Sequence, residues 1–129
     1  MIRDGAHLAR SDEEKEAVYR FRYEVYVEEM GRYRGIADHV KRRFREPEDD
    51  SARVFYAGVD GQIVATSRFN WGGDASFTDR LVDHYRLAPF LAEIPAEAMA
   101  GGERGMGKPD LRGSSIFSEL GERAQSFIS

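Results

Sequence analysis

The chain has 129 residues, a net charge of −4 and 41% hydrophobic residues, which suits one globular domain with a modest core and excludes disorder. It contains no cysteine, which excludes disulfides, thiolate catalysis and cysteine-ligated metals. The negative charge disfavours general nucleic-acid binding, and the lack of a long apolar run or an apolar signal sequence predicts a soluble, cytoplasmic protein without a membrane span.

The N-terminal part predicts a strand, a helix and a polar loop. Residues 7–11 can start as a short strand, after which Ser11 and Glu14 have the capping-box spacing of a helix N-terminus. Gly31 is placed to end this helix. Hydrophobic residues with helical spacing form its buried stripe, namely Val18, Phe21, Val25 and Tyr26.

The polar segment 32–50 predicts a loop with one helical turn. Within it, residues 39–45 are locally basic. We interpret this run as a solvated surface, with an anion-docking patch as the less favoured alternative.

Residues 53–69 predict a β-hairpin, because two β-rich runs flank Asp60 and Gly61. This pair suits a type I′ turn, in which both central residues need a positive φ. Counting outwards from a two-residue turn predicts that Arg53 lies opposite Arg68, with both arginines on the same face of the sheet.

The rest of the chain predicts a loop at residues 70–77, an irregular helix at residues 78–94 that is broken by Pro89, and a weak strand at residues 98–110 that contains four glycines. A final helix starts near Gly113. Its predicted buried side comprises Ile116, Phe117, Leu120, Ala124 and Phe127.

The start of this final helix has the composition of an anion site. Unpaired backbone N–H groups and the helix dipole favour a phosphate, Gly113 permits a close approach of the backbone, and Arg112 adds a charged donor. A helix that is merely capped by Ser114 and Ser115 is the structural alternative.

Taken in order, these features resemble a known superfamily. The strand, the helix carrying "RFRYEVYVEE", the hairpin ending "IVATSRF", the glycine-rich strand and "LRGSS" before a helix resemble the GNAT superfamily of N-acyltransferases. Within it, the chain most resembles the branch of autoinducer synthases and long-chain N-acyl amino acid synthases. The resemblance covers residues 7–128.

The resemblance implies an α/β (α+β) fold with a mixed, mostly antiparallel central sheet flanked by helices. Residues 1–129 would form a single domain equivalent to the N-terminal portion of the family fold, which continues with a further strand, a helix and two more strands. The chain therefore looks truncated at its C-terminal side, and its open sheet edge suggests that a second copy could complete the sheet.

The resemblance also implies an activity: transfer of an acyl group from an acyl-CoA or acyl-carrier-protein thioester to the amine of a small acceptor, such as an amino acid or S-adenosylmethionine, without a metal. One alternative is a non-catalytic module that binds an acyl thioester or carrier protein, to which the basic run could dock. Another is a protein-interaction domain with a coincidental pattern.

By resemblance, the segment at the start of the final helix would wrap the pyrophosphate of CoA or the phosphopantetheine of a carrier protein. It consists of Leu111, Arg112, Gly113, Ser114 and Ser115.

The acceptor side of the site would be shaped by a buried ionic network. Arg22 shares a helix face with Tyr26, and an arginine within an apolar stripe needs a carboxylate partner. The resemblance supplies an acidic pair and a strand arginine, and ion pairing without a catalytic role is the structural alternative. The predicted network contains Arg22, Glu46 or Asp49, Arg68 and, as a further member, Arg104.

Glu103 is the candidate general base, because the acceptor ammonium must lose a proton before it attacks the thioester. Judged by position in the sequence instead of by chemistry, Arg104 is the preferred catalytic residue of this strand. Since adjacent residues of a strand point to opposite faces, only one of the two is expected to face the cleft. The backbone amide of Met106 is a candidate oxyanion donor.

No metal site or hydrolase site is predicted. His7, His39 and His84 are far apart in the sequence and lack ligand spacing. No nucleophile elbow is present.

Overall fold

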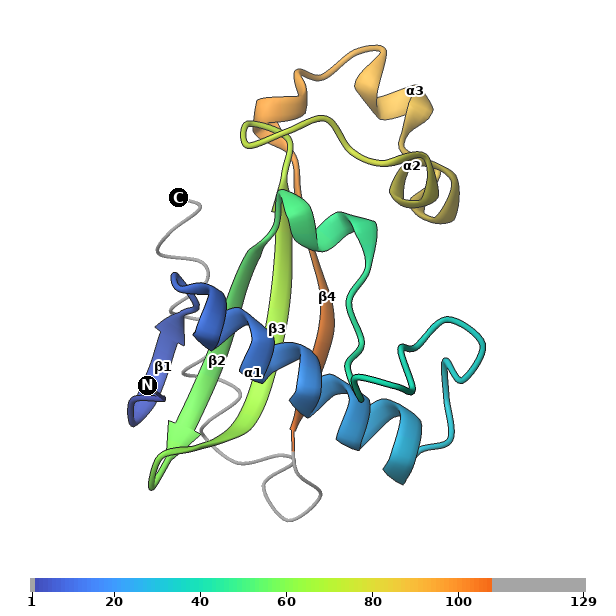
Figure 1. Cartoon of the computed structure of the whole chain (residues 1–129). Coiled ribbons are helices and arrows are strands. Elements are labelled where there is room, and N and C mark those ends of the chain that lie inside the picture. Colours follow the sequence, from blue (N-terminus) through green and yellow to red (C-terminus); the bar gives the residue numbers. More distant parts are fainter. Residues whose placement is uncertain (1, 108–129) are drawn as a thin grey trace.

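The computed structural model of the chain describes residues 2–107. They form a four-stranded antiparallel sheet in the order β1-β2-β3-β4 (Figure 1). The class predicted from the sequence is confirmed: a mixed α/β fold with an antiparallel sheet flanked by helices. The strands are β1 (Gly5–Leu8), β2 (Arg53–Val59), β3 (Gln62–Trp71) and β4 (Ala100–Gly107).

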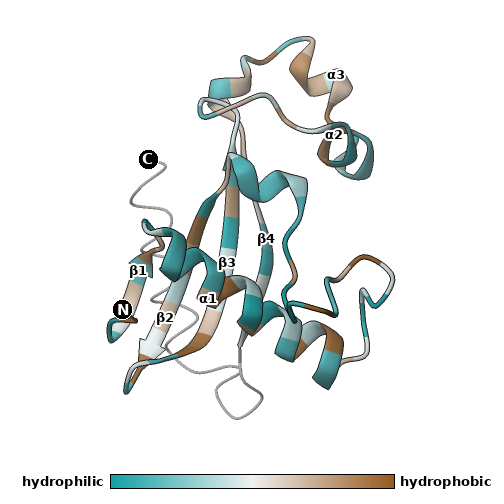
Figure 2. Cartoon of the chain, in the orientation of Figure 1, coloured by the Kyte–Doolittle hydropathy of each residue, from teal (hydrophilic) through white to brown (hydrophobic). Residues whose placement is uncertain are grey.

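Helix α1 (Asp12–Arg22) crosses one face of the sheet. The predicted capping box is confirmed, since the Ser11 side chain accepts from the Glu14 amide while the Glu14 carboxylate accepts from the Ser11 amide. Acidic residues fill the first turn, where the helix dipole favours negative charge. Figure 2 shows this end of α1 in hydrophilic colours.

The helix continues without a break as the π-helix η1 (Tyr23–Glu29), which the sequence pattern did not predict. Its wider turn is seen in the bond from the Met30 amide to the Val25 carbonyl, 2.9 Å long. Gly31 follows with a φ of 67°, as expected for a residue that ends a helix.

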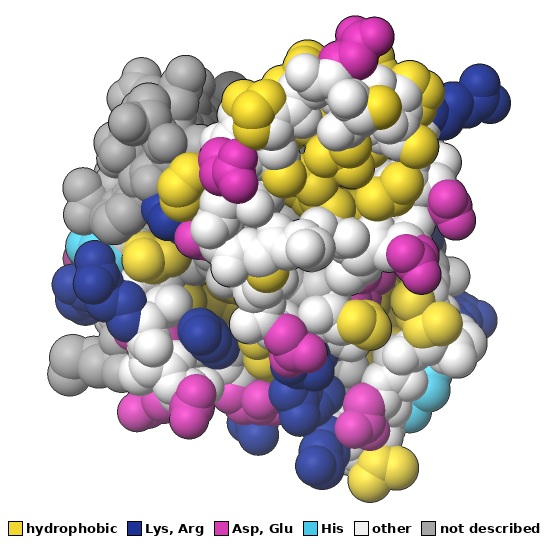
Figure 3. Space-filling view, turned by 90° about the horizontal axis from the view of Figure 1, so that it is seen from above, with side chains coloured by type: hydrophobic (Ala, Val, Ile, Leu, Met, Phe, Trp, Pro, Cys, Tyr) yellow, Lys and Arg dark blue, Asp and Glu magenta, His cyan; other side chains and the backbone are white. Residues whose placement is uncertain are grey.

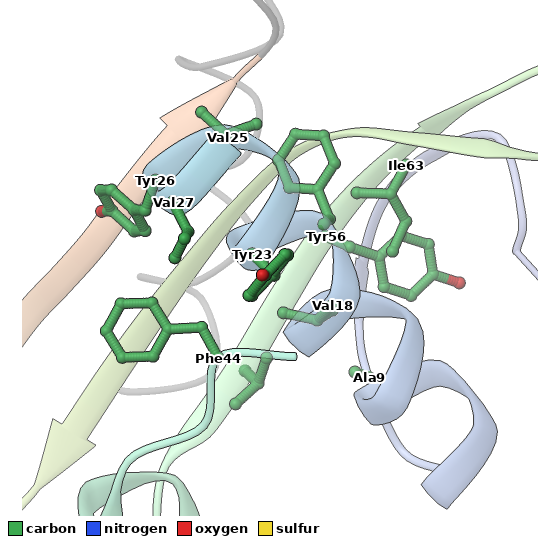
Figure 4. Close-up of a cluster of buried hydrophobic side chains, with 11 residues drawn as sticks. Ala9, Val18, Tyr23, Val25, Tyr26, Val27, Phe44, Tyr56 and Ile63 are labelled. Carbon is green, nitrogen blue, oxygen red and sulfur yellow. The ribbon is translucent and has the colours of Figure 1, made fainter. Parts of the chain in front are cut away.

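The main core lies between this helix and the sheet. The predicted stripe is confirmed, as all four of its residues are buried. Figure 4 shows these side chains together with Phe44, which enters from the loop, meeting Tyr56 and Ile63 from the sheet. A second cluster occupies the other face of the sheet and contains Ala6, Phe55, Ala57, Val64 and Ala65.

The hairpin turn at Asp60 and Gly61 is confirmed, with φ values of 53° and 78°. The predicted register is wrong beyond the first pairs, because β3 contains a bulge at Val64 that shifts the pairing by one residue. Arg68 therefore lies opposite Val54 on the face that α1 covers, whereas Arg53 lies on the other face.

A second bulge shifts the pairing of β3 with β4. Thr66 pairs with Met106, but Arg68 pairs with Glu103, so Arg104 and Gly105 together oppose a single residue of β3. Arg104 has a φ of 56°, in the left-handed region. The alternation of side chains along β4 is interrupted at this point.

Short helices connect the strands. The predicted turn in the polar loop is the 3₁₀ helix η2 (Pro47–Asp50). The irregular helix is two pieces, α2 (Asp79–Tyr85) and α3 (Ala88–Leu91), and the 3₁₀ turn η3 (Ala96–Ala98) leads into β4. No helix within residues 2–107 has the length and apolarity needed to cross a bilayer.

Candidate functional site

The site is organised by η2, which carries acidic residues over the sheet. Glu46 and Asp49 form a reciprocal cap, with the Glu46 amide donating to Asp49 Oδ2 at 2.8 Å. Pro47 occupies the first turn, where its fixed φ suits a helix start. This local geometry turns both carboxylates toward the sheet, where Arg68 lies.

The ionic network predicted from the sequence is present. Arg22 Nη1 donates to Asp49 Oδ2 at 2.8 Å, and both side chains are fully buried. Arg68, which is 0% exposed, donates from Nη1 to Glu46 at 3.1 Å and to Asp49 at 3.3 Å. Both members of the acidic pair take part, where the sequence left the choice open.

The prediction that only one of Glu103 and Arg104 faces this site is wrong. Glu103 accepts from Arg68 Nη2 at 2.9 Å. Arg104 donates from Nε and Nη2 to Glu46 at 2.6 and 2.9 Å. The bulge in β4 is the physical reason, because it breaks the alternation that the prediction assumed.

Three further residues extend the network, and the sequence analysis did not predict them as site residues. Arg80, from α2, donates to Glu48 at 2.8 Å and to Glu103 at 2.6 Å. The Tyr85 hydroxyl donates to Glu103 at 2.8 Å. The acidic run at residues 46–50 was an available signal for Glu48, but nothing in the local pattern around Arg80 indicated its role.

Among the described residues, the network balances four arginines against four carboxylates. Because each carboxylate is paired with an arginine, the formal charges of the cluster cancel. The arginines are Arg22, Arg68, Arg80 and Arg104, and the carboxylates are Glu46, Glu48, Asp49 and Glu103.

Three of the carboxylates are held in their charged form. Burial raises the pKa of Glu46, but the hydrogen bond and charge of Arg104 outweigh burial and lower it. Burial likewise opposes ionisation of Asp49, and Arg22 and Arg68 lower its pKa. For Glu103, bonds from Arg80, Tyr85 and Arg68 overcome burial and lower the pKa to about 2.

This electrostatic setting bears on the candidate general base. A carboxylate with a pKa of about 2 accepts protons weakly at neutral pH. It is, however, a fixed negative charge that can attract and orient an ammonium. The lowered pKa of Glu103 therefore favours an orienting role over direct proton abstraction.

Tyr26 lies beside the network rather than in it. Its ring packs edge-on against Tyr33 and Phe44, with centroids 5.2 and 5.8 Å away, and burial raises the pKa of its hydroxyl. Tyr33 in turn accepts a hydrogen bond from Arg104 at 3.2 Å. These rings form the apolar boundary of the network on the side of η1.

An apolar pocket adjoins the network at the other end of β4. Its volume is about 240 Å³, and Glu103 and Tyr85 lie at its edge. Figure 3, which looks down on the α2–α3 end of the molecule, shows hydrophobic side chains gathered there. The pocket is lined by Phe77, Leu81, Leu87, Met99 and Ala100, with Asn70, Gly101 and Gly102.

Other candidates have ordinary structural surroundings. His39 donates from Nε2 to the Arg34 carbonyl and is hydrogen-bonded through Nδ1 to the Tyr23 hydroxyl, and His7 donates from Nε2 to the Asp4 carbonyl. Residues 2–107 contain no group of three or more potential metal ligands. In the basic run, Arg43 pairs with Glu16 at 3.1 Å.

Two more arginines of the basic run also have acidic partners: Arg42 pairs with Glu28, and Arg45 pairs with Asp50. The anion segment at residues 111–115 and the final helix lie outside the described residues. Met106 is opposite Thr66 in the sheet, and its suggested role remains a prediction.

The fold and its arginine–carboxylate network can be set beside known proteins. No protein-family model matches the chain, and no curated protein matches it either. Among solved structures, its fold is similar to that of an autoinducer synthase. This is BjaI, a CoA-dependent acyl-homoserine lactone synthase whose structure was solved with MTA.

The two structures superpose with a TM-score of 0.70 at 16% sequence identity. The match covers 96% of this chain and 59% of that synthase, so the chain spans about three fifths of the synthase's length. The chain therefore has an autoinducer-synthase-like fold.

Proposed function

We propose that this chain carries the site of a GNAT-type N-acyltransferase, which moves an acyl group from a thioester of CoA or a carrier protein to a small amine. The observation that carries the proposal is the fold shared with a CoA-dependent synthase over 96% of the chain. The apolar pocket beside a network of ionised groups is consistent with it, since an acyl chain and a polar acceptor need such neighbours.

In the proposed reaction, the acceptor nitrogen forms a bond to the thioester carbonyl carbon, and the carbon–sulfur bond then breaks to release a thiol. The acceptor ammonium gives up two protons: the first passes to solvent and frees the lone pair for attack, and the departing sulfur ultimately receives the second through solvent. Preorganised charges assist by positioning the amine, as bound substrates react faster when they are correctly oriented. The acceptor could be an amino acid or S-adenosylmethionine.

The residues have distinct proposed roles. Glu103 orients the acceptor ammonium, while Arg68 and Arg104 hold the acidic groups in place. The buried set Arg22, Glu46 and Asp49 fixes η2 against the sheet, with Tyr26 as an apolar wall. The segment of Leu111, Arg112, Gly113, Ser114 and Ser115 is proposed to bind the phosphates of the donor.

A thiol-release assay on the full-length protein, with acyl-CoA and a panel of small amines, tests this proposal. We expect amine-dependent thiol release. Arg112→Ala should weaken acyl-CoA binding in calorimetry, and Glu103→Gln should slow transfer with binding kept. Arg20→Met, on the exposed side of α1, is the matched control. Thiol release that does not depend on any amine would contradict the transferase.

A binding module without catalysis is the second candidate function. The observation that favours it is the full engagement of Glu103 by two arginines and a tyrosine, which leaves it a weak base. Calorimetric heat with acyl-CoA, combined with no turnover for any amine, would support the module. Absence of binding would remove both candidates and leave the protein-interaction domain.

A further inference from the structure

The two oxygens of the Glu103 carboxylate have different partners. Oε1 accepts from Arg68 Nη2 at 2.9 Å and from Arg80 Nη2 at 2.6 Å. Oε2 accepts from the Tyr85 hydroxyl at 2.8 Å, and its contact with Arg80 Nη1 is long, at 3.5 Å. Since a carboxylate oxygen has about two acceptor positions, charged donors saturate Oε1, whereas the one short bond to Oε2 comes from a neutral group.

These partners also differ in how firmly they are held. Arg68 is 0% exposed and binds further carboxylates of the network. Arg80 is fixed by a second bond, from its Nε to Glu48 at 2.8 Å. Tyr85, by contrast, is 48% exposed and lies at the last position of α2. The tyrosine hydroxyl is therefore the donor that can leave Glu103 with the least loss of packing and of other bonds.

The apolar pocket gives a ligand access to this contact. Glu103 and Tyr85 both line the pocket, together with apolar residues such as Phe77 and Leu87. It lies at the α2–α3 end of the molecule, where Figure 3 shows hydrophobic side chains gathered. A ligand in the pocket therefore adjoins the tyrosine and the carboxylate at once. Because exposed side chains change rotamer rapidly, movement of Tyr85 opens Oε2 to such a ligand.

An ammonium group can take the place of the hydroxyl. Both groups donate a hydrogen bond to Oε2, and the ammonium adds the attraction of opposite charges. The guanidinium groups at Oε1 repel a further cation, so the gain comes from the short contact with Oε2 rather than from the network as a whole. Burial and the contact with Glu103 raise the pKa of Tyr85, so the hydroxyl keeps its proton and competes for this position at neutral pH.

We propose that Tyr85 occupies the ammonium site of Glu103 when no acceptor is bound, and that the acceptor ammonium displaces the hydroxyl from Oε2 and takes over its bond. This inference rests on the proposed function, in which Glu103 orients the acceptor. Tyr85 is then a positioning residue. It keeps the carboxylate in place between turnovers and lowers the affinity for the amine by the strength of one hydrogen bond.

Tyr85→Phe tests this exchange, because it removes the hydroxyl and keeps the ring. The probe is phenethylammonium, whose ring fits the pocket, since a cavity of about 150 Å³ accommodates benzene. In calorimetry on the full-length protein, we expect Tyr85→Phe to bind the probe roughly fivefold more tightly, the effect of one net hydrogen bond. Unchanged or weaker binding of the probe would overturn the inference.

A second probe separates the hydrogen bond from charge and space. Trimethyl(phenethyl)ammonium has the same ring and charge but no N–H group, so Tyr85→Phe should leave its affinity unchanged. Tyr23→Phe is the matched control variant, because the Tyr23 hydroxyl bonds to His39 at 2.8 Å, outside the network. It should alter the affinity for neither probe. Equal tightening of both probes by Tyr85→Phe would contradict an exchange of donors at Oε2.

A measurement on the unaltered protein needs no variant to fold. The carbon NMR signal of Tyr85 Cζ, the atom that carries the hydroxyl, reports its hydrogen bond directly. We expect phenethylammonium to shift this signal as the hydroxyl leaves Glu103, and the trimethylated probe to shift it less. Saturation with phenethylammonium that leaves the signal in place would show that the hydroxyl is not displaced.

The failure of this inference differs from a failure of the proposed function. Tighter binding of phenethylammonium to Tyr85→Phe, without thiol release from any thioester, would sustain the ammonium site and reject the transferase. Amine-dependent thiol release with the same KM for the amine in Tyr85→Phe and in the unaltered protein would sustain the transferase and reject the role of Tyr85.

Discussion

Arg68 is the residue on which the ionic network depends. Its buried guanidinium contacts Glu46, Asp49 and Glu103, which come from two different parts of the chain. A buried ion pair adds little net stability when compared with a well-packed apolar pair, but removal of one partner leaves uncompensated charge. The network is therefore more important for fixing one arrangement of η2 and β4 than for the total stability.

The substitution Arg68→Met tests this dependence. We expect a loss of about 3–5 kcal/mol in the free energy of unfolding, because three carboxylates lose a shared cation in a buried setting. Urea denaturation measures it. Arg20→Met, which removes an exposed pair with Glu16, should cost less than about 1 kcal/mol. Similar losses for the two variants would contradict the account.

The carboxylate of Glu14 should contribute to the pH dependence of stability. Burial opposes its ionisation, but bonds from Tyr56, Ser11 and Arg10 lower the pKa to about 2. A pKa that is lower in the folded state contributes stability above the ordinary value near 4.5, and this contribution is lost as the pH falls toward 2.

We therefore expect Glu14→Gln to flatten the fall in stability between pH 4.5 and pH 2, as measured by urea denaturation at a series of pH values. Glu93→Gln, at an exposed site beyond α3, should leave the profile unchanged. A fall of the same steepness in all three proteins would disprove the contribution of Glu14.

At the scale of elements, local signals predicted most of the fold. Each of these signals lies within a few neighbouring residues: the capping box of Ser11 and Glu14, the turn at Asp60 and Gly61, and the helical spacing before Gly31. The two bulges are different, because an extra residue in a strand is accommodated by its partner strand and leaves no mark on the local pattern. The register errors follow from this.

The same distinction applies to the site. Charged residues inside an apolar stripe, such as Arg22, indicated that a buried network must exist, and the resemblance supplied Glu46 and Asp49. Arg80 could not be predicted, because its role depends on where α2 lies relative to β4. The hydrogen bond from Asn70 Nδ2 to the Glu48 carbonyl is likewise a tertiary contact that the local sequence does not indicate.

The pairing of β1 with β2 depends on close approach of the backbone at Gly58. A Cβ added there would lie 2.2 Å from the Arg3 carbonyl oxygen. Gly58→Ala should therefore push the start of the chain away from β2 and cost about 1–3 kcal/mol. Urea denaturation measures the loss, and Gly35→Ala, with no atom near its added Cβ, should cost much less.

At the scale of the whole molecule, residues 79–98 are attached differently from the rest. Leu81 is the buried residue of α2, and α3 contains none. Ion pairs from Arg80, the hydroxyl of Tyr85 and the bond from Trp71 Nε1 to the Glu97 carbonyl hold this region to the sheet. A region that is held by ion pairs and hydrogen bonds opens at a lower free energy than one that is held by a packed apolar interface.

Amide hydrogen exchange should therefore be faster in α2 and α3 than in β2 and β3, whose residues are paired on both sides and largely buried. Mass spectrometry of peptides covering these elements measures the rates, and α1 provides an internal reference of packed helix. Equal protection of α2 and β3 from exchange would show that these polar contacts hold the region as firmly as the apolar core holds the sheet.

The bulge in β4 determines which side chains of this strand reach the ionic network. Two residues of β4 oppose one residue of β3 at the bulge, which interrupts the alternation of side chains. Glu103 and Arg104 therefore both reach the ionic network, although they are adjacent in sequence. A relative that lacked one residue at the level of Gly105 would keep its sheet and its hydrogen-bonded ladder. It would nevertheless turn one of these two charges to the opposite face and leave its partners unmatched, so the number of residues in β4 matters as much as their identity.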